Sequence, residues 1–180
     1  VVLKETELEK LIKLIRPKPV LVVTDSQMFK RVDELVPRDI PLTGFSIMLA
    51  RHKGDFEQYL KGTPKLDELS DGDRVLLLES CTHQVACDDI GRFKIPAWIK
   101  QHTAKRIEFE VVAGLNELPR PVTDYALIIQ CGACMITRRQ LRGRIRPAIE
   151  AGVPVTNYGM AIAWLHGIYN RAIEPFTNKR

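Results

Sequence analysis

Two short clusters of metal-binding residue types carry the chemistry that this sequence can offer. The first is the C-x-H motif of residues 81–83, and the second is the C-x-x-C motif of residues 131–134. In an extended segment residues i and i+2 point to the same side, so the thiol of Cys81 and the imidazole of His83 can face one site. The C-x-x-C spacing brings two sulfurs round one metal, and Gly132 permits a tight backbone between them. Together the two motifs predict a metal site.

Each motif follows a run of residues that is typical of a buried β-strand. The first run is residues 75–78 (VLLL), and the second is residues 125–129 (YALII). Short apolar runs without alternation are typical of parallel strands that are covered on both faces. Open α/β sheets bind ligands at the carboxyl ends of their strands, so we expect the metal site there. We also expect Cys134 to open a helix that begins near Met135, where unpaired backbone N–H groups favour a thiolate.

The two motifs alone do not identify the metal. Three thiolates and one imidazole also describe a closed structural zinc site. In a plainer interpretation, the three cysteines of the motifs are only small buried apolar residues, as free cysteines often are. Cys87 lies close to the first motif, and we interpret it as a bystander rather than as a ligand.

Sequence features outside the two motifs extend the pattern over nearly the whole chain. With the motifs included, the sequence resembles the carboxyl-terminal part of the HydF family, the [FeFe]-hydrogenase maturation GTPases. The shared segments, which occur in the family's order, make this resemblance far more specific than either cysteine motif. They are residues 21–27 (LVVTDSQ), 40–46 (IPLTGFS), 71–74 (DGDR), 81–83 (CTH), 88–92 (DDIGR), 131–135 (CGACM), 156–159 (TNYG) and 165–167 (LHG).

The resemblance implies a particular cofactor and ligand set. The family pattern is C-x-H, a long spacer and H-C-x-x-C, and Gln130 stands here where the pattern has its second histidine. The resemblance implies a [4Fe–4S] cluster held by Cys81, Cys131 and Cys134, with one iron open to exchange. His83 would be either an exchangeable fourth ligand or a hydrogen-bond donor beside the cluster.

The resemblance also implies a function and partners. Such proteins act as scaffolds and carriers that receive a di-iron precursor of the hydrogenase cofactor from radical-SAM maturation enzymes and transfer it to apo-[FeFe]-hydrogenase. They carry a GTPase domain, but no GxxxxGK(S/T) phosphate loop occurs in this sequence, so we expect no GTPase activity from these residues. The resemblance further implies a homodimer. The alternative function is a structural-zinc module that binds protein or nucleic acid.

Composition and charge narrow the classes of protein that the sequence can be. Its 180 residues carry a net charge of +5, with 45% hydrophobic and 27% charged residues, which is ordinary for a globular domain. No apolar run approaches the roughly 20 residues that span a bilayer, and we recognise no signal peptide. We therefore expect a cytoplasmic protein with no membrane partner. The sequence has four cysteines, and we expect reduced thiols that serve a metal rather than two disulfides.

A basic stretch follows the second motif. It lacks the interleaved aromatic residues of many nucleic-acid sites, so we expect a solvent-exposed helix face and no nucleic-acid partner. Docking to an acidic protein is the functional alternative. The basic residues are Arg138, Arg139, Arg142, Arg144 and Arg146.

The alternation of strand and helix patterns predicts an α/β fold with two small parallel-sheet domains. We expect a dimerisation domain over residues 1–66, truncated at its start, and an iron–sulfur-cluster-binding domain over residues 67–180. The Gly, Pro and Asp content of residues 61–73 predicts a linker between them. The expected strands are 1–3, 20–23, 40–43, 74–79, 107–112, 125–129 and 153–156. The expected helices are 5–15, 29–36, 46–60, 88–102, 135–151 and 160–173.

Overall fold

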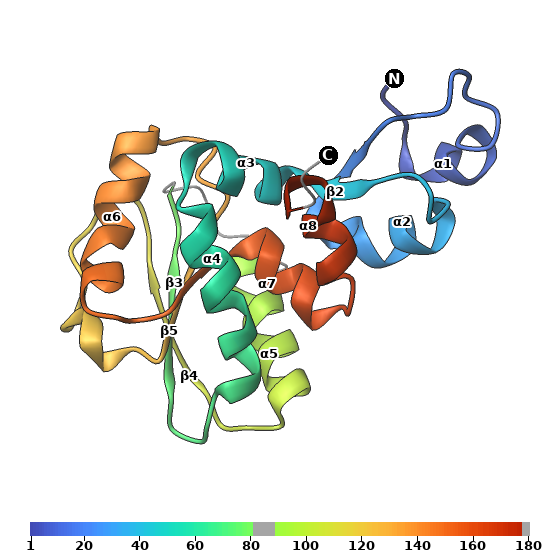
Figure 1. Cartoon of the computed structure of the whole chain (residues 1–180). Coiled ribbons are helices and arrows are strands. Elements are labelled where there is room, and N and C mark those ends of the chain that lie inside the picture. Colours follow the sequence, from blue (N-terminus) through green and yellow to red (C-terminus); the bar gives the residue numbers. More distant parts are fainter. Residues whose placement is uncertain (81–88, 178–180) are drawn as a thin grey trace.

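The computed structural model of the chain describes residues 1–80 and 89–177, which form two parallel β-sheets with helices packed around them (Figure 1). The smaller sheet has two strands and the larger has four. The predicted α/β class and the parallel pairing are therefore confirmed. Within the described residues, no helix is long and apolar enough to cross a membrane.

The amino-terminal part of the chain builds the smaller sheet. Val22–Thr24 (β1) pairs in parallel with Leu42–Gly44 (β2). Between these strands lie the 3-10 turn Ser26–Met28 (η1) and the helix Phe29–Leu35 (α2), and the helix Glu5–Leu11 (α1) precedes them. The core of this unit consists of Leu8, Ile12, Val32, Val36, Ile40 and Leu42.

Two expectations at this end of the chain are wrong. The predicted strand over residues 1–3 does not form, because Val1 and Val2 are almost fully exposed and pair with no strand among the described residues. Helix α1 ends at Leu11 rather than at residue 15. Beyond Ile12 its apolar stripe loses its packing surface, since Ile15, the last predicted member of the stripe, is only half-buried.

The larger sheet carries the candidate site. Its strands are Arg74–Leu78 (β3), Glu108–Val112 (β4), Leu127–Gln130 (β5) and Val155–Asn157 (β6), and their order is β4-β3-β5-β6. All three pairings are parallel. The central strands β3 and β5 are almost entirely buried, as their unbroken apolar runs predict.

Helices cover both faces of the larger sheet (Figure 1). Arg138–Glu150 (α6) lies on one face. Phe56–Gly62 (α4), Ile95–Thr103 (α5) and Tyr158–Leu165 (α7) lie on the other. The remaining helical segments are Phe45–Lys53 (α3), Thr63–Glu68 (η2), the π-helix Ile90–Lys94 (η3), Val122–Asp124 (η4) and Tyr169–Thr177 (α8).

Two long helices of the prediction are each divided in the structure. The helix predicted over residues 46–60 is interrupted at Gly54, and Asp55 starts α4 by accepting a hydrogen bond from the Gln58 backbone N–H (3.3 Å). The helix predicted over residues 160–173 is interrupted at Gly167, whose φ of 74° is left-handed. Capping groups therefore override a continuous apolar pattern at both places.

Residues 61–73 are not the loop that their composition predicts. Residues 63–68 form η2, and Leu66 is fully buried in the core of the larger sheet. The Thr63 and Thr156 hydroxyls form a buried hydrogen bond of 2.6 Å, which fastens this segment to β6. Burial of Leu66 thus orders a segment that is rich in turn-forming residues.

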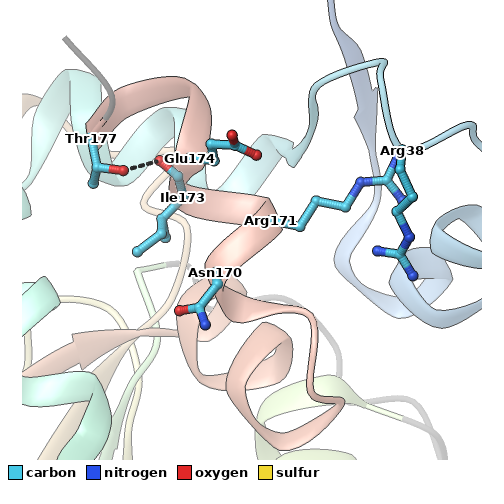
Figure 2. Close-up of a pocket in the computed structure, with 6 residues that line it drawn as sticks. All are labelled: Arg38, Asn170, Arg171, Ile173, Glu174 and Thr177. Carbon is cyan, nitrogen blue, oxygen red and sulfur yellow. Dashed lines mark hydrogen bonds between the residues drawn. The ribbon is translucent and has the colours of Figure 1, made fainter.

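Helix α8 connects the larger sheet to the smaller one. The Thr43 hydroxyl of β2 donates a buried hydrogen bond to the Ala172 carbonyl (2.8 Å). The Arg171 side chain, only 9% exposed, donates to the Asp33 carboxylate (2.8 Å). Figure 2 shows Arg171 reaching from α8 towards Arg38, beside an open pocket whose lining contains no cysteine or histidine. Cys131 and Cys134, the predicted ligands that the structure describes, do not line this pocket.

The contact of α4 with β6 gives a test of the fold. A Cβ added at Gly62 would lie 2.0 Å from the Val155 carbonyl oxygen, and a backbone atom in a sheet cannot move away cheaply. We expect Gly62→Ala to lower the free energy of unfolding by about 3 kcal/mol, the upper end of overpacking costs. Chemical denaturation of the purified variant measures this.

Gly143→Ala is the matched control. Gly143 lies in the middle of α6 at a solvent-exposed position, and apart from its own helix backbone no atom lies within 4 Å of an added Cβ. Removing a flexible helix residue there should raise the free energy of unfolding by about 0.5–1 kcal/mol. Equal effects of the two substitutions would contradict the packing of α4 on β6.

Candidate metal-binding site

The two cysteine motifs follow neighbouring strands that end at the same edge of the sheet. Strands β3 and β5 pair in parallel with Leu78 opposite Gln130. Directly after β5, the Cys131 backbone N–H donates to the Leu78 carbonyl (2.9 Å). The Cys131 thiol donates to the Ser80 hydroxyl (3.0 Å), and the Ser80 N–H donates to the Cys131 sulfur (3.1 Å). Ser80 immediately precedes Cys81 in the sequence.

Three residues of the sequence prediction lie outside the described residues. They are Cys81, His83 and Cys87. Within the described residues, no group of three or more His, Cys, Asp or Glu side chains is placed to hold a metal ion. The structure therefore describes two of the four predicted ligands, Cys131 and Cys134.

The loop of residues 131–134 is shaped by contacts from a distant helix. Ala133 is buried and left-handed, with φ of 56°. The Lys53 ammonium of α3 donates to the carbonyls of Ala133 (3.1 Å) and Ile136 (3.0 Å). Cys131 is half-buried and Cys134 is exposed, so one sulfur is protected and the other lies at the surface.

One detail of the predicted geometry after this loop is wrong. Helix α6 begins at Arg138 rather than near Met135, so Cys134 does not open it. The reason is a capping box: the Thr137 hydroxyl accepts from the Gln140 N–H (3.3 Å), and the Gln140 side chain accepts from the Thr137 N–H (2.9 Å).

Gln130, at the position of the missing histidine, is fully buried and points back into the edge of the sheet. Its side-chain N–H groups donate to the Ser80 hydroxyl (2.9 Å) and the Leu78 carbonyl (3.2 Å). The same side chain thus supports the Ser80 backbone that leads into the first motif. Its Oε1 atom has no partner within the part of the chain that the structure describes.

A charged clamp flanks the segment that carries the first motif. The Glu79 carboxylate, 4% exposed, precedes this segment, and Arg92, which follows it, donates to both carboxylate oxygens (3.2 and 2.8 Å). The Arg144 guanidinium donates to the carbonyls of Glu79 and Val112, the latter at 2.8 Å. Burial lowers the pKa of Arg144 from its ordinary value. The Arg92–Glu79 ion pair therefore links the residues that precede and follow this segment, and Arg144 binds the preceding residue.

Two buried tyrosines complete the surroundings of Cys131. The hydroxyls of Tyr59 and Tyr158 are buried and have no hydrogen-bond partner among the described residues. Burial is the largest cause that raises the pKa of both hydroxyls above the ordinary tyrosine value. Both therefore remain neutral donors. Unpaired buried donors are rare in folded proteins, and they favour an additional group or ordered water here.

Sequence reasoning missed the supporting residues of this edge. Lys53 has no local signal, because it lies 80 positions away from the loop that it binds. Ser80 offered a weak signal, since it is a polar residue that directly follows a buried strand and precedes a cysteine. Arg144 was assigned to a solvent-exposed face, but it is half-buried and donates to two carbonyls.

The fold and this edge define an α/β protein with two cysteines in the loop at the carboxyl end of a central parallel strand. Comparison with family models identifies it further. Residues 57–175 match the hydrogen maturase F tetramerization domain, and residues 1–54 match the hydrogen maturase F dimerization domain. The chain therefore belongs to the hydrogen maturase F (HydF) family, as its motifs predict. No curated protein matches the chain.

The domain matches bear on assembly and on function. Both matched domains are named for oligomer formation, which points to an oligomeric protein. The family as a whole points to hydrogenase maturation.

The clamp of Glu79 and Arg92 gives a test of the site's architecture. Arg92→Met should leave the buried Glu79 carboxylate without its charged partner. We expect a loss of about 3 kcal/mol in the free energy of unfolding, the low end for a buried pair because Arg92 is 32% exposed. Arg106→Met is the control: Arg106 is 94% exposed and its pairing should be worth under about 1 kcal/mol. Similar losses in both variants would show that the clamp does not hold this edge.

Proposed function

We propose that this chain binds a [4Fe–4S] cluster through Cys81, Cys131 and Cys134. We further propose that it serves as a scaffold and carrier in [FeFe]-hydrogenase maturation. The observation that carries the proposal is the contact of the Cys131 thiol with Ser80, the residue before Cys81. This contact supports the proposal because it brings Ser80, the last described residue before the C-x-H motif, to the C-x-x-C loop.

The donor set fits such a cluster. Iron–sulfur clusters are held by cysteine thiolates, and two of the proposed thiolates share one short loop. The unpaired hydroxyls of Tyr59 and Tyr158 also fit, because sulfide and thiolate groups accept hydrogen bonds. When bound, the cluster would supply an iron with an exchangeable coordination position. The chain's own residues would fix the thiolates and limit the access of water.

The fourth position of the cluster is the functional one in this proposal. Gln130 stands where the family has its second histidine, and its side chain is hydrogen-bonded to Ser80 and Leu78. This supports a fourth coordination position that residue 130 does not occupy. His83 is proposed either as an exchangeable ligand at that position or as a hydrogen-bond donor beside it. Cys87 is proposed as a bystander.

The partners follow from the family. We propose that the substrate is a di-iron precursor made by radical-SAM maturation enzymes, and that the acceptor is apo-[FeFe]-hydrogenase. We also propose a cytoplasmic homodimer whose contact lies in the dimerisation domain, placed at residues 1–66, with the cluster in residues 67–180. The match of residues 1–54 to a dimerization domain supports this arrangement.

Single cysteine substitutions test the ligand set. Cys81→Ser, Cys131→Ser and Cys134→Ser should each remove most of the iron, sulfide and visible absorbance after anaerobic reconstitution, because two thiolates are too few to hold the cluster. Cys87→Ser is the matched control and should retain all three signals.

Two results would contradict this assignment. One is a full cluster in any of the three proposed ligand variants, and the other is loss of the cluster in Cys87→Ser. One zinc per chain without sulfide would instead support the structural-zinc alternative.

A further inference from the structure

The chain around Cys134 is rich in arginine, and part of this positive charge pairs with no carboxylate of the described residues. Residues 131–149 contain five arginines and no Asp or Glu. Arg144 points inward to the Glu79 carbonyl, and Arg146 pairs with Glu150 (3.2 Å). The other three, Arg138, Arg139 and Arg142, are exposed, and we name them the basic rim.

Two of the three side chains of the basic rim are unpaired among the described residues. Neither Arg138 nor Arg139 has a hydrogen bond or an ion pair with any described residue. Arg142 donates to the Gly54 carbonyl (3.1 Å), which places the first turns of α6 against the end of α3. Residues 40–54, which include α3, also lack Asp and Glu. Arg138 and Arg139 thus keep their charge unpaired at the surface.

Exposed apolar side chains lie next to the basic rim. Met135 is 73% exposed and adjoins Cys134 in the sequence. On α3, Ser46 and Leu49 are the residues nearest to Gly132, and Phe45 and Met48 flank them on the neighbouring helical stripe. Phe45 and Met48 are 59% and 38% exposed. The surface therefore combines an apolar area with cations, as docking surfaces do.

The helices that carry the basic rim and the residues Phe45 and Met48 meet at one end of the larger sheet (Figure 1). Figure 1 places α3 and the first turns of α6 at the end where β3 finishes. The surface consequently surrounds the loop of residues 131–134, and a protein that docks there would sit over the proposed cluster.

We propose that the basic rim, with Phe45, Met48 and Met135, is the docking surface for the protein that accepts the cargo, through an acidic patch on that acceptor. This inference rests on the proposed function. A second copy of the chain is a poor occupant, because a two-fold contact would bring the basic rims of both copies together. Nucleic acid is disfavoured because the rim has no interleaved aromatic residues along α6.

Charge reversal tests the proposal on the full chain after cluster reconstitution. Arg138→Glu combined with Arg139→Glu should weaken binding to purified apo-[FeFe]-hydrogenase roughly tenfold, mainly through slower association. The difference from the unmodified chain should shrink as salt is raised. Iron and sulfide contents should be unchanged, since neither arginine contacts the cysteine loop. Biolayer interferometry over a salt series measures the association rate.

Lys105→Glu combined with Arg106→Glu is the matched control. These residues precede β4 at the opposite end of the sheet, are exposed, and change the net charge equally. This variant should bind the hydrogenase as the unmodified chain does.

Three outcomes would overturn the proposal. Equal weakening by both double variants would show a net-charge effect only. An altered oligomeric state of the rim variant would assign the surface to contacts between copies. Binding of a DNA or RNA duplex that the rim variant loses would assign it to nucleic acid. Absence of iron and sulfide from the unmodified chain would refute the proposed function separately, since that result does not depend on the rim.

Discussion

The parallel pairing of β3 with β5 is the constraint on which the rest of the site depends. In its register Leu78 lies opposite Gln130. The backbone N–H of the next residue, Cys131, donates a hydrogen bond to the Leu78 carbonyl (2.9 Å). Two segments that are about 50 residues apart in sequence therefore end together, and the Cys131 sulfur meets Ser80. Because both strands are buried on both faces, a shift of register would expose apolar side chains, and this fixes the position of the cysteines.

The edge formed in this way must satisfy its polar groups, and the chain does so with long side chains from remote elements. Lys53 binds the carbonyls of the cysteine loop, Arg144 binds those at the ends of β3 and β4, and Arg92 neutralises the buried Glu79. Among the described residues, the Tyr158 hydroxyl at this edge has no hydrogen-bond partner. A buried donor left open beside carbonyls that remote side chains satisfy is suited to bind an additional group.

The sequence predicted the six strands that form and the family, and it failed where a helix cap or a distant contact decides the geometry. The apolar runs that precede the cysteines were sufficient to place Cys131 at a strand end, because burial of a parallel sheet dictates such runs. The start of α6 at Arg138 was missed, because a capping box determined it and not the apolar period. The roles of Lys53 and Arg144 were missed because each side chain acts across the fold. Cys134 is consequently an exposed loop residue rather than the first residue of a helix.

Iron and acid-labile sulfide analysis of the unmodified chain, combined with Mössbauer spectroscopy after anaerobic reconstitution with ⁵⁷Fe, tests the central claim most directly. We expect equal amounts of iron and sulfide at the [4Fe–4S] stoichiometry. We also expect one iron subsite whose Mössbauer signal changes when a small ligand such as imidazole is added. Iron bound without sulfide, or a spectrum that added ligand leaves unchanged, would contradict a three-thiolate cluster with an exchangeable position.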